Sequence, residues 1–190
     1  MFLSFLSATL VALGLIATAV GFSDGFLMVA AVLLAIDVFI GAASLARIAS
    51  ASADDIRFLQ AMNRIRHAYV EMTPVVEPYF MGGHHDDPAT VLSMYGPVES
   101  TPVTSIVHGL TTTPGMVGVI TAAVGAALAA VLAMLATHDP VAAGVTGVVT
   151  FVVLFFLIIV VSMRTIGRFW AGMHTMFPKD AADESGPSPR

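Results

Sequence analysis

The sequence predicts an all-α fold: a polytopic helical membrane protein, with four transmembrane helices in two hairpins and a cytoplasmic juxtamembrane helix. The first observation is a set of four apolar blocks, each close to the roughly 20 residues that a helix needs to cross a bilayer. The second is composition, since 57% of the residues are hydrophobic and 11% are charged, against about 25% charged in a soluble domain. Lipid must therefore cover much of the surface. The blocks are residues 1–22, 25–46, 115–137 and 141–163.

The first block has an alternative interpretation as a secretory signal, because Ala17-Thr18-Ala19 resembles a small-residue cleavage site. It lacks the positively charged start of a signal peptide, and its apolar run is longer than the usual one. We interpret it as the first transmembrane helix, with cleavage as the alternative.

Two short turns divide the blocks into hairpins, residues 1–47 and 113–163. Thr113 before Pro114, and Asp139 before Pro140, are typical of a capping side chain followed by proline at the first helical position. The turns themselves are Ser23-Asp24-Gly25 and Thr137-His138-Asp139-Pro140.

The placement of lysine and arginine predicts the orientation, because basic residues concentrate on the cytoplasmic side. Neither short turn contains one. Four spans place both termini on the same side, which agrees with this bias. We therefore expect a multi-pass protein of the plasma membrane with both termini and residues 48–112 in the cytoplasm. The basic residues are Arg47, Arg57, Arg64, Arg66, Arg164, Arg168, Lys179 and Arg190.

The cytoplasmic segment 48–112 is predicted to contain a helix and a loop. Apolar residues recur every three or four positions, which is typical of a helix, and Pro74 and Pro78 are expected to end it. The second span is expected to run into this helix with little break. Residues 81–112 are rich in Gly, Pro, Ser and Thr and predict an extended loop. The apolar positions are Ile56, Leu59, Met62, Ile65 and Tyr69.

The end of the chain predicts an interfacial helix and a tail. Residues 164–177 combine Arg164 and Arg168 with aromatic residues such as Trp170, a pattern typical of a helix at the head-group level. Residues 178–190 are polar and are expected to be disordered.

Asp37 is the one ionisable residue within the four blocks, and it lies near the middle of the second. An ionised carboxylate at the bilayer centre costs about 2.5–3.5 kcal/mol on insertion scales, and desolvation favours the neutral acid. We therefore expect a mostly protonated Asp37 that faces away from lipid. Thr9 and Thr150 are expected at the same depth. A structural hydrogen bond and an ion or proton role both remain open.

The third span has small residues at four-residue spacing, which let helix backbones approach closely in lipid. The pattern favours either packing within one chain or contact between copies. Its members are Gly118, Ala122, Gly125, Ala126 and Ala130.

Two groups of residues suggest metal ligands at first sight. His84-His85-Asp86-Asp87 follows two glycines, and we interpret it as a polar turn. His67 and Glu71 lie four residues apart on the predicted helix and are interpreted as a solvated pair. The sequence therefore predicts no metal site and no cofactor.

Three short motifs in the cytoplasmic segment resemble uncharacterised small polytopic membrane proteins of high-GC Gram-positive, actinobacterial type. The composition, rich in Ala and Val, suits such a source. The resemblance implies a plasma-membrane location, and it implies no activity and no functional residue. The motifs are Met62-Asn63-Arg64-Ile65-Arg66-His67-Ala68-Tyr69, Glu77-Pro78-Tyr79-Phe80 and His84-His85-Asp86-Asp87.

Three classes of function remain. A non-enzymatic membrane protein that assembles with itself or with partners through the small-residue face is favoured. The alternative is a small oligomeric channel or transporter that uses Asp37 for a proton or cation. A membrane enzyme is least favoured, because the polar residues match no known mechanism. The chain has no cysteine and no basic tract, so the expected partners are lipid and membrane proteins and not nucleic acid.

Overall fold

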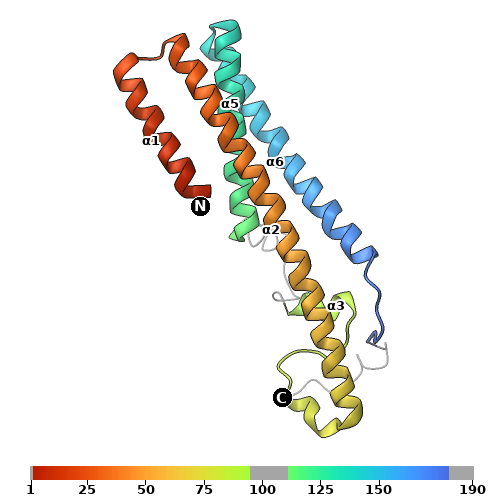
Figure 1. Cartoon of the computed structure of the whole chain (residues 1–190). Coiled ribbons are helices and arrows are strands. Elements are labelled where there is room, and N and C mark those ends of the chain that lie inside the picture. Colours follow the sequence, from red (N-terminus) through yellow and green to blue (C-terminus); the bar gives the residue numbers. More distant parts are fainter. Residues whose placement is uncertain (1, 95–110, 180–190) are drawn as a thin grey trace. The chain divides into compact units, whose positions relative to one another are not determined.

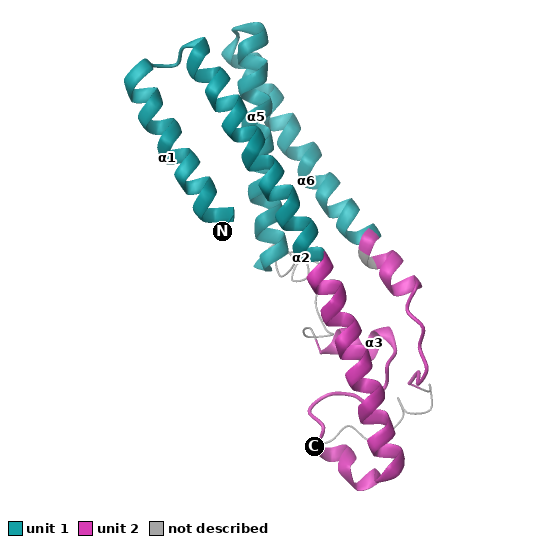
Figure 2. Cartoon of the chain, in the orientation of Figure 1, with its two compact units in different colours: residues 1–49, 106–164 teal, residues 50–105, 165–190 magenta. Residues whose placement is uncertain are grey.

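The computed structural model describes residues 2–94 and 111–179, apart from the side chain of Ile166. All the regular secondary structure assigned in these residues is helical (Figure 1). They form two compact units, each described by itself below: unit 1 is residues 1–49 and 106–164, and unit 2 is residues 50–105 and 165–190 (Figure 2). The helices are α1 (Phe2–Val20), α2 (Asp24–Met72), η1 (Pro74–Tyr79, a 3₁₀ helix), α3 (Pro88–Ser93), α5 (Thr113–Thr137) and α6 (Pro140–Ala171).

Four of the helices, α1, α2, α5 and α6, are long and apolar enough to cross a membrane. This confirms the four apolar helices that the sequence predicts. Helix α2 is continuous from the second apolar block through the amphipathic stretch and ends at Met72, two residues before Pro74, as expected. At the start of α6, the Asp139 side chain accepts a hydrogen bond from the backbone N–H of Val141. The cap of α5 lies one residue earlier than predicted, at Thr112 instead of Thr113.

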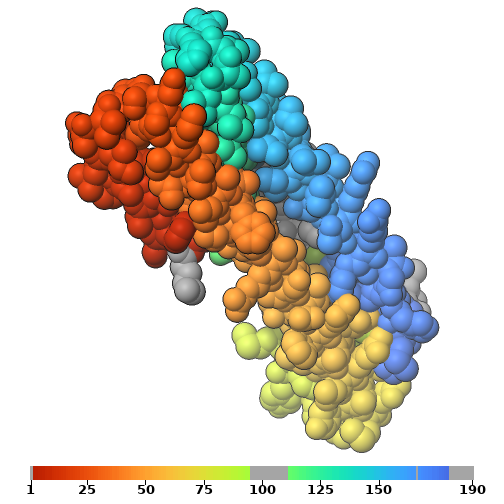
Figure 3. Space-filling view, turned by 45° about the horizontal axis from the view of Figure 1, so that its top comes forward, coloured from red at the N-terminus to blue at the C-terminus, as the bar shows by residue number. Residues whose placement is uncertain are grey.

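The core of unit 1 is formed mainly by α2 and α5. In each of the four long helices, an 18-residue stretch is apolar enough to cross a membrane. One third of this stretch is buried in α2 and 22% in α5, against 6% in α1 and in α6. The outer faces of α1, in red, and of α6, in blue, are visible in Figure 3, and they carry exposed apolar side chains that lipid would cover. The buried cluster consists of Leu13, Phe26, Leu27, Ala30, Leu34 and Val124.

The two short turns of unit 1 lie next to each other. Nδ1 of His138, in the turn between α5 and α6, is 3.9 Å from Oδ1 of Asp24, which begins α2. Both side chains are exposed. The α1–α2 and α5–α6 connections are therefore at the same end of this unit.

Two segments of unit 2 differ from the prediction. Residues 88–93 form α3 inside the stretch predicted to be loop, because Asp87 caps the helix and accepts a hydrogen bond from the backbone N–H of Thr90. The predicted interfacial helix, residues 164–177, is the last part of α6 and ends at Ala171. Residues 172–177 are not helical. Residues 95–110 of the predicted loop and 180–190 of the predicted tail lie outside the described residues.

Candidate functional site

Asp37 is fully buried in unit 1, which agrees with the expectation that it faces away from lipid. The Thr9 hydroxyl on α1 donates a hydrogen bond to Oδ1 of Asp37 over 3.4 Å, which is a long bond. Oδ2 of Asp37 is buried and has no hydrogen-bond partner among the described residues. Thr150, the other predicted partner, is half-buried and makes no described hydrogen bond to Asp37. The carboxyl group thus links α1 to α2 through one of its two oxygens.

The small residues of α5 are used for packing within this chain. A methyl group added to Gly118 would lie 3.3 Å from Ile158 of α6 and 3.9 Å from Leu45 of α2. One added to Gly125 would lie 2.6 Å from Leu154 of α6. Ala122, Gly125 and Ala126 are buried, and Ala130 is half-buried. The face that was predicted to bring helices together is therefore covered by α2 and α6 of the same chain.

Asp86 connects three segments of unit 2, although the sequence predicted a polar turn at this position. Its side chain is 0% exposed. It accepts a hydrogen bond from Nε of Arg64 at 2.8 Å, and from the backbone N–H groups of Met176 and Phe177 at 3.0 and 2.7 Å. One carboxylate thereby joins α2, the loop before α3 and the segment after α6.

The charge state of Asp86 follows from these contacts. Burial by itself raises the pKa of Asp86. The hydrogen bonds from Met176, Phe177 and Arg64, together with the positive charge of Arg64, lower it by more, so the pKa of Asp86 is below its usual value. Next to it, burial by itself raises the pKa of Asp87. Hydrogen bonds from the hydroxyl and the backbone N–H of Thr90 contribute to a larger lowering, so the pKa of Asp87 is also below its usual value. Both carboxyl groups are therefore ionised at neutral pH.

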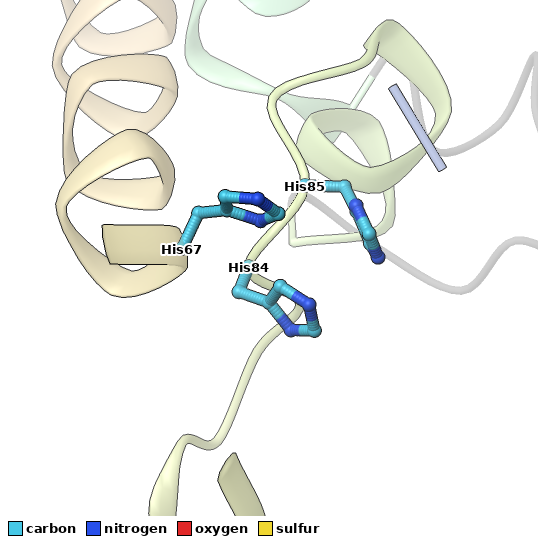
Figure 4. Close-up of side chains that lie close together, drawn as sticks. All are labelled: His67, His84 and His85. Atoms are coloured by element: carbon cyan, nitrogen blue, oxygen red, sulfur yellow. The ribbon is translucent and has the colours of Figure 1, made fainter. Parts of the chain in front are cut away.

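Three histidines of unit 2 lie together, and they are the group in the described residues that could hold a metal ion. His67 on α2 meets His84 and His85 from the loop before α3, and one possible ligand atom from each lies within 4.8 Å of the others (Figure 4). All three are half-buried, so His67 is not the solvated residue that was predicted. Its Nε2 is 3.6 Å from Oε1 of Glu71, beyond hydrogen-bond range.

The predicted interfacial residues lie on both sides of the boundary between the units. Arg164, at the end of the unit 1 part of α6, is exposed, and so is Arg168 in unit 2. Trp170 is half-buried and packs edge-to-face on Phe169, over whose ring the guanidinium of Arg57 lies at 5.7 Å. A role of these residues at the head-group level remains a prediction.

Comparison with known proteins yields no match to a family model, to a curated protein or to a solved structure.

Proposed function

We propose that this chain is a non-enzymatic integral membrane protein of the plasma membrane, in which unit 1 spans the bilayer and unit 2 is cytoplasmic. The observation that carries the proposal is the pairing of Asp37 with Thr9 inside unit 1, because a carboxyl group that bonds a neighbouring helix has a structural role. The adjacent turns of unit 1 support a topology of two hairpins with both turns outside the cell. The one-sided basic residues support the orientation.

Assembly with a second copy or with another membrane protein is part of this proposal. The small-residue face of α5 is covered by the chain's own helices, so such assembly would use the exposed apolar faces of α1 and α6. Size measurement in nanodiscs tests this part. A strictly monomeric particle, with no cross-linking between copies in native membranes, would contradict self-assembly.

A double-mutant cycle tests the structural role of Asp37. Thr9→Val leaves the buried carboxyl group without a described partner, so we expect a loss of roughly 0.6–2 kcal/mol in the free energy of unfolding. Thr9→Val combined with Asp37→Leu replaces both partners by apolar groups and is expected to be less destabilised than the sum of the single variants. Thr146→Val is the matched control, because the hydrogen bond of the Thr146 hydroxyl among the described residues is to the carbonyl of Ala142 in its own helix. Strictly additive effects would contradict a Thr9–Asp37 interaction.

The second candidate function is a channel or transporter that moves a proton or cation through Asp37. Its support is the buried Oδ2 that lacks a hydrogen-bond partner among the described residues, since intramembrane carboxyl groups often mark ion pathways. Asp37→Asn separates the candidates: the structural role predicts a folded protein with unchanged liposome ion flux, and the transport role predicts a folded protein whose flux is lost.

A further inference from the structure

The histidine cluster of unit 2 combines side chains from two separate segments. His67 comes from α2, and His84 and His85 come from a loop that begins with Gly82-Gly83. The ring centroids of His84 and His85 are 4.2 Å apart, and those of His67 and His84 are 5.4 Å apart. Figure 4 shows the His67 ring directed from the helix toward this loop. The rings meet through the tertiary structure and not through a local sequence pattern.

Buried contacts hold the cluster in place. The side-chain amide of Asn63, itself 0% exposed, donates a hydrogen bond to the carbonyl oxygen of His85 at 2.8 Å. The Phe177 ring stacks on His67 with centroids 4.2 Å apart. A methyl group added to Gly83 would collide with the side chain of Thr90 in α3, so glycine allows the loop to pass close to that helix. The loop is therefore fixed by α2, α3 and the segment after α6.

The chemistry of the cluster suits a divalent transition metal. Imidazole nitrogen is a preferred ligand of Zn²⁺ and of neighbouring first-row ions, and a Zn–N bond of about 2.0–2.1 Å in tetrahedral geometry separates two ligand nitrogens by about 3.3 Å. The atoms of the cluster lie within 4.8 Å of one another. Side-chain rotations that draw them together by about 1–2 Å would complete three ligand positions.

Two of the histidines have a carboxylate close to one ring nitrogen. Histidines that bind a metal commonly donate their second ring N–H to such a carboxylate. Oε1 of Glu71 is 3.6 Å from Nε2 of His67, and Oε1 of Glu77 is 3.8 Å from Nδ1 of His84. Small movements would let each carboxylate accept the N–H of its histidine, and the other ring nitrogen would then face the metal. His84 and His85 also line an open cavity of about 380 Å³, which gives a fourth coordination position access to solvent.

We propose that unit 2 binds one divalent transition-metal ion through His67, His84 and His85, with the fourth position open to a water molecule or an exogenous ligand. Three protein ligands and one open position are typical of zinc sites that exchange a ligand, whereas four protein ligands are typical of closed structural sites. The site goes beyond the proposed function and is independent of Asp37.

The experiment titrates the full-length protein in nanodiscs with Zn²⁺ against a chromophoric chelator, and with Co²⁺ by visible absorption. We expect one ion per chain with a Kd below about 1 µM. His67→Ala, His84→Ala and His85→Ala should each weaken Zn²⁺ binding by at least about 100-fold, because loss of even an outer partner costs about 10–100-fold. Glu71→Gln should weaken it by about 10-fold.

His174→Ala is the matched control, because His174 is an exposed histidine of the same unit whose described hydrogen bonds, from Gln60 and Arg64, are made by its backbone carbonyl oxygen. It should bind Zn²⁺ like the wild type. Metal-free circular dichroism and thermal unfolding of each variant separate loss of a ligand from loss of the fold.

Three outcomes would overturn the proposal. The first is a wild-type protein that binds no Zn²⁺ or Co²⁺ stoichiometrically, a result that needs no variant. The second is equal loss of binding in the His174→Ala control. The third is binding of inorganic phosphate by the metal-free protein that requires the histidines and Lys179, which lines the same cavity, because the cluster would then be a site for anions.

Discussion

Replacing Asp86 with alanine removes the carboxylate that joins three segments of unit 2. The backbone N–H groups of Met176 and Phe177 donate to this carboxylate at 3.0 and 2.7 Å. A hydrogen bond to a charged group contributes about 1.5–3 kcal/mol, so the two together contribute about 3–6 kcal/mol. The ion pair with Arg64, whose side chain is 34% exposed, adds at most about 1 kcal/mol. The two backbone bonds alone therefore predict that Asp86→Ala costs about 3–6 kcal/mol of local stability.

Amide hydrogen exchange measures this local stability directly. The segment after α6 is attached to α2 and to the loop before α3 through Asp86, so loss of the carboxylate should release residues 172–179 first. Since about 1.4 kcal/mol corresponds to a factor of ten, the amides of Met176 and Phe177 should exchange about 10²- to 10⁴-fold faster. Asp86→Asn keeps one acceptor oxygen and should lie between alanine and the wild type.

Asp55→Asn is the control, because Asp55 is an exposed carboxylate of the same unit and its substitution should leave exchange unchanged. If the amides of Met176 and Phe177 exchange at the wild-type rate in Asp86→Ala, the carboxylate of Asp86 does not hold residues 172–179 in place. If amide exchange accelerates equally in Asp55→Asn, the effect comes from the change in net charge.

Three further predictions follow from burial and charge. Because the pKa of Asp86 is lowered from 3.8, its stabilising contribution is complete at neutral pH and is lost as pH falls through the folded-state pKa. Exchange at Phe177 should accelerate below about pH 4, and this acid dependence should be absent in Asp86→Asn. Ala122→Leu, at a buried position of α5, should lower the free energy of unfolding by about 1–3 kcal/mol, whereas Ala123→Leu, at an exposed position of the same helix, should not; equal thermal stability of the two would count against close packing there. In this cysteine-free chain, cysteines at Asp24 and His138 should react with an impermeant thiol reagent on intact cells and one at the exposed Tyr79 should not, and the reverse labelling would invert the proposed topology.

The four long apolar helices could be predicted because their signal is local. Long apolar blocks have few alternatives to a helix when lipid is the solvent. Proline after a capping side chain marked the start of α6 correctly and that of α5 to within one residue. The same signal, Asp87 before Pro88, was available for α3, but the surrounding glycines and prolines favoured a loop.

The structure of unit 2 could not be predicted to the same extent, because its contacts join residues that are distant in sequence. Nothing near Asp86 in the chain indicates that Met176 and Phe177 donate to it, since they are 90 and 91 residues away. His67 lies 17 residues before His84 in the sequence, far beyond the spacing at which helix periodicity brings side chains together. Adjacent polar residues such as His84-His85-Asp86-Asp87 are ordinarily solvated, and only the contacts of the folded unit identify Asp86 as buried.

The two fully buried aspartates differ in what the protein supplies to them. Asp86 has an arginine and two backbone N–H groups directed at its oxygens, so its negative charge is compensated at short distance. Asp37 has one hydroxyl at 3.4 Å and one oxygen without a described partner. A neutral amide therefore removes strong charge-assisted bonds at position 86, whereas at position 37 its oxygen can still accept the hydrogen bond from the Thr9 hydroxyl. Asparagine should consequently destabilise unit 2 at position 86 and leave unit 1 folded at position 37, so any defect of Asp37→Asn would be a defect of activity and not of folding.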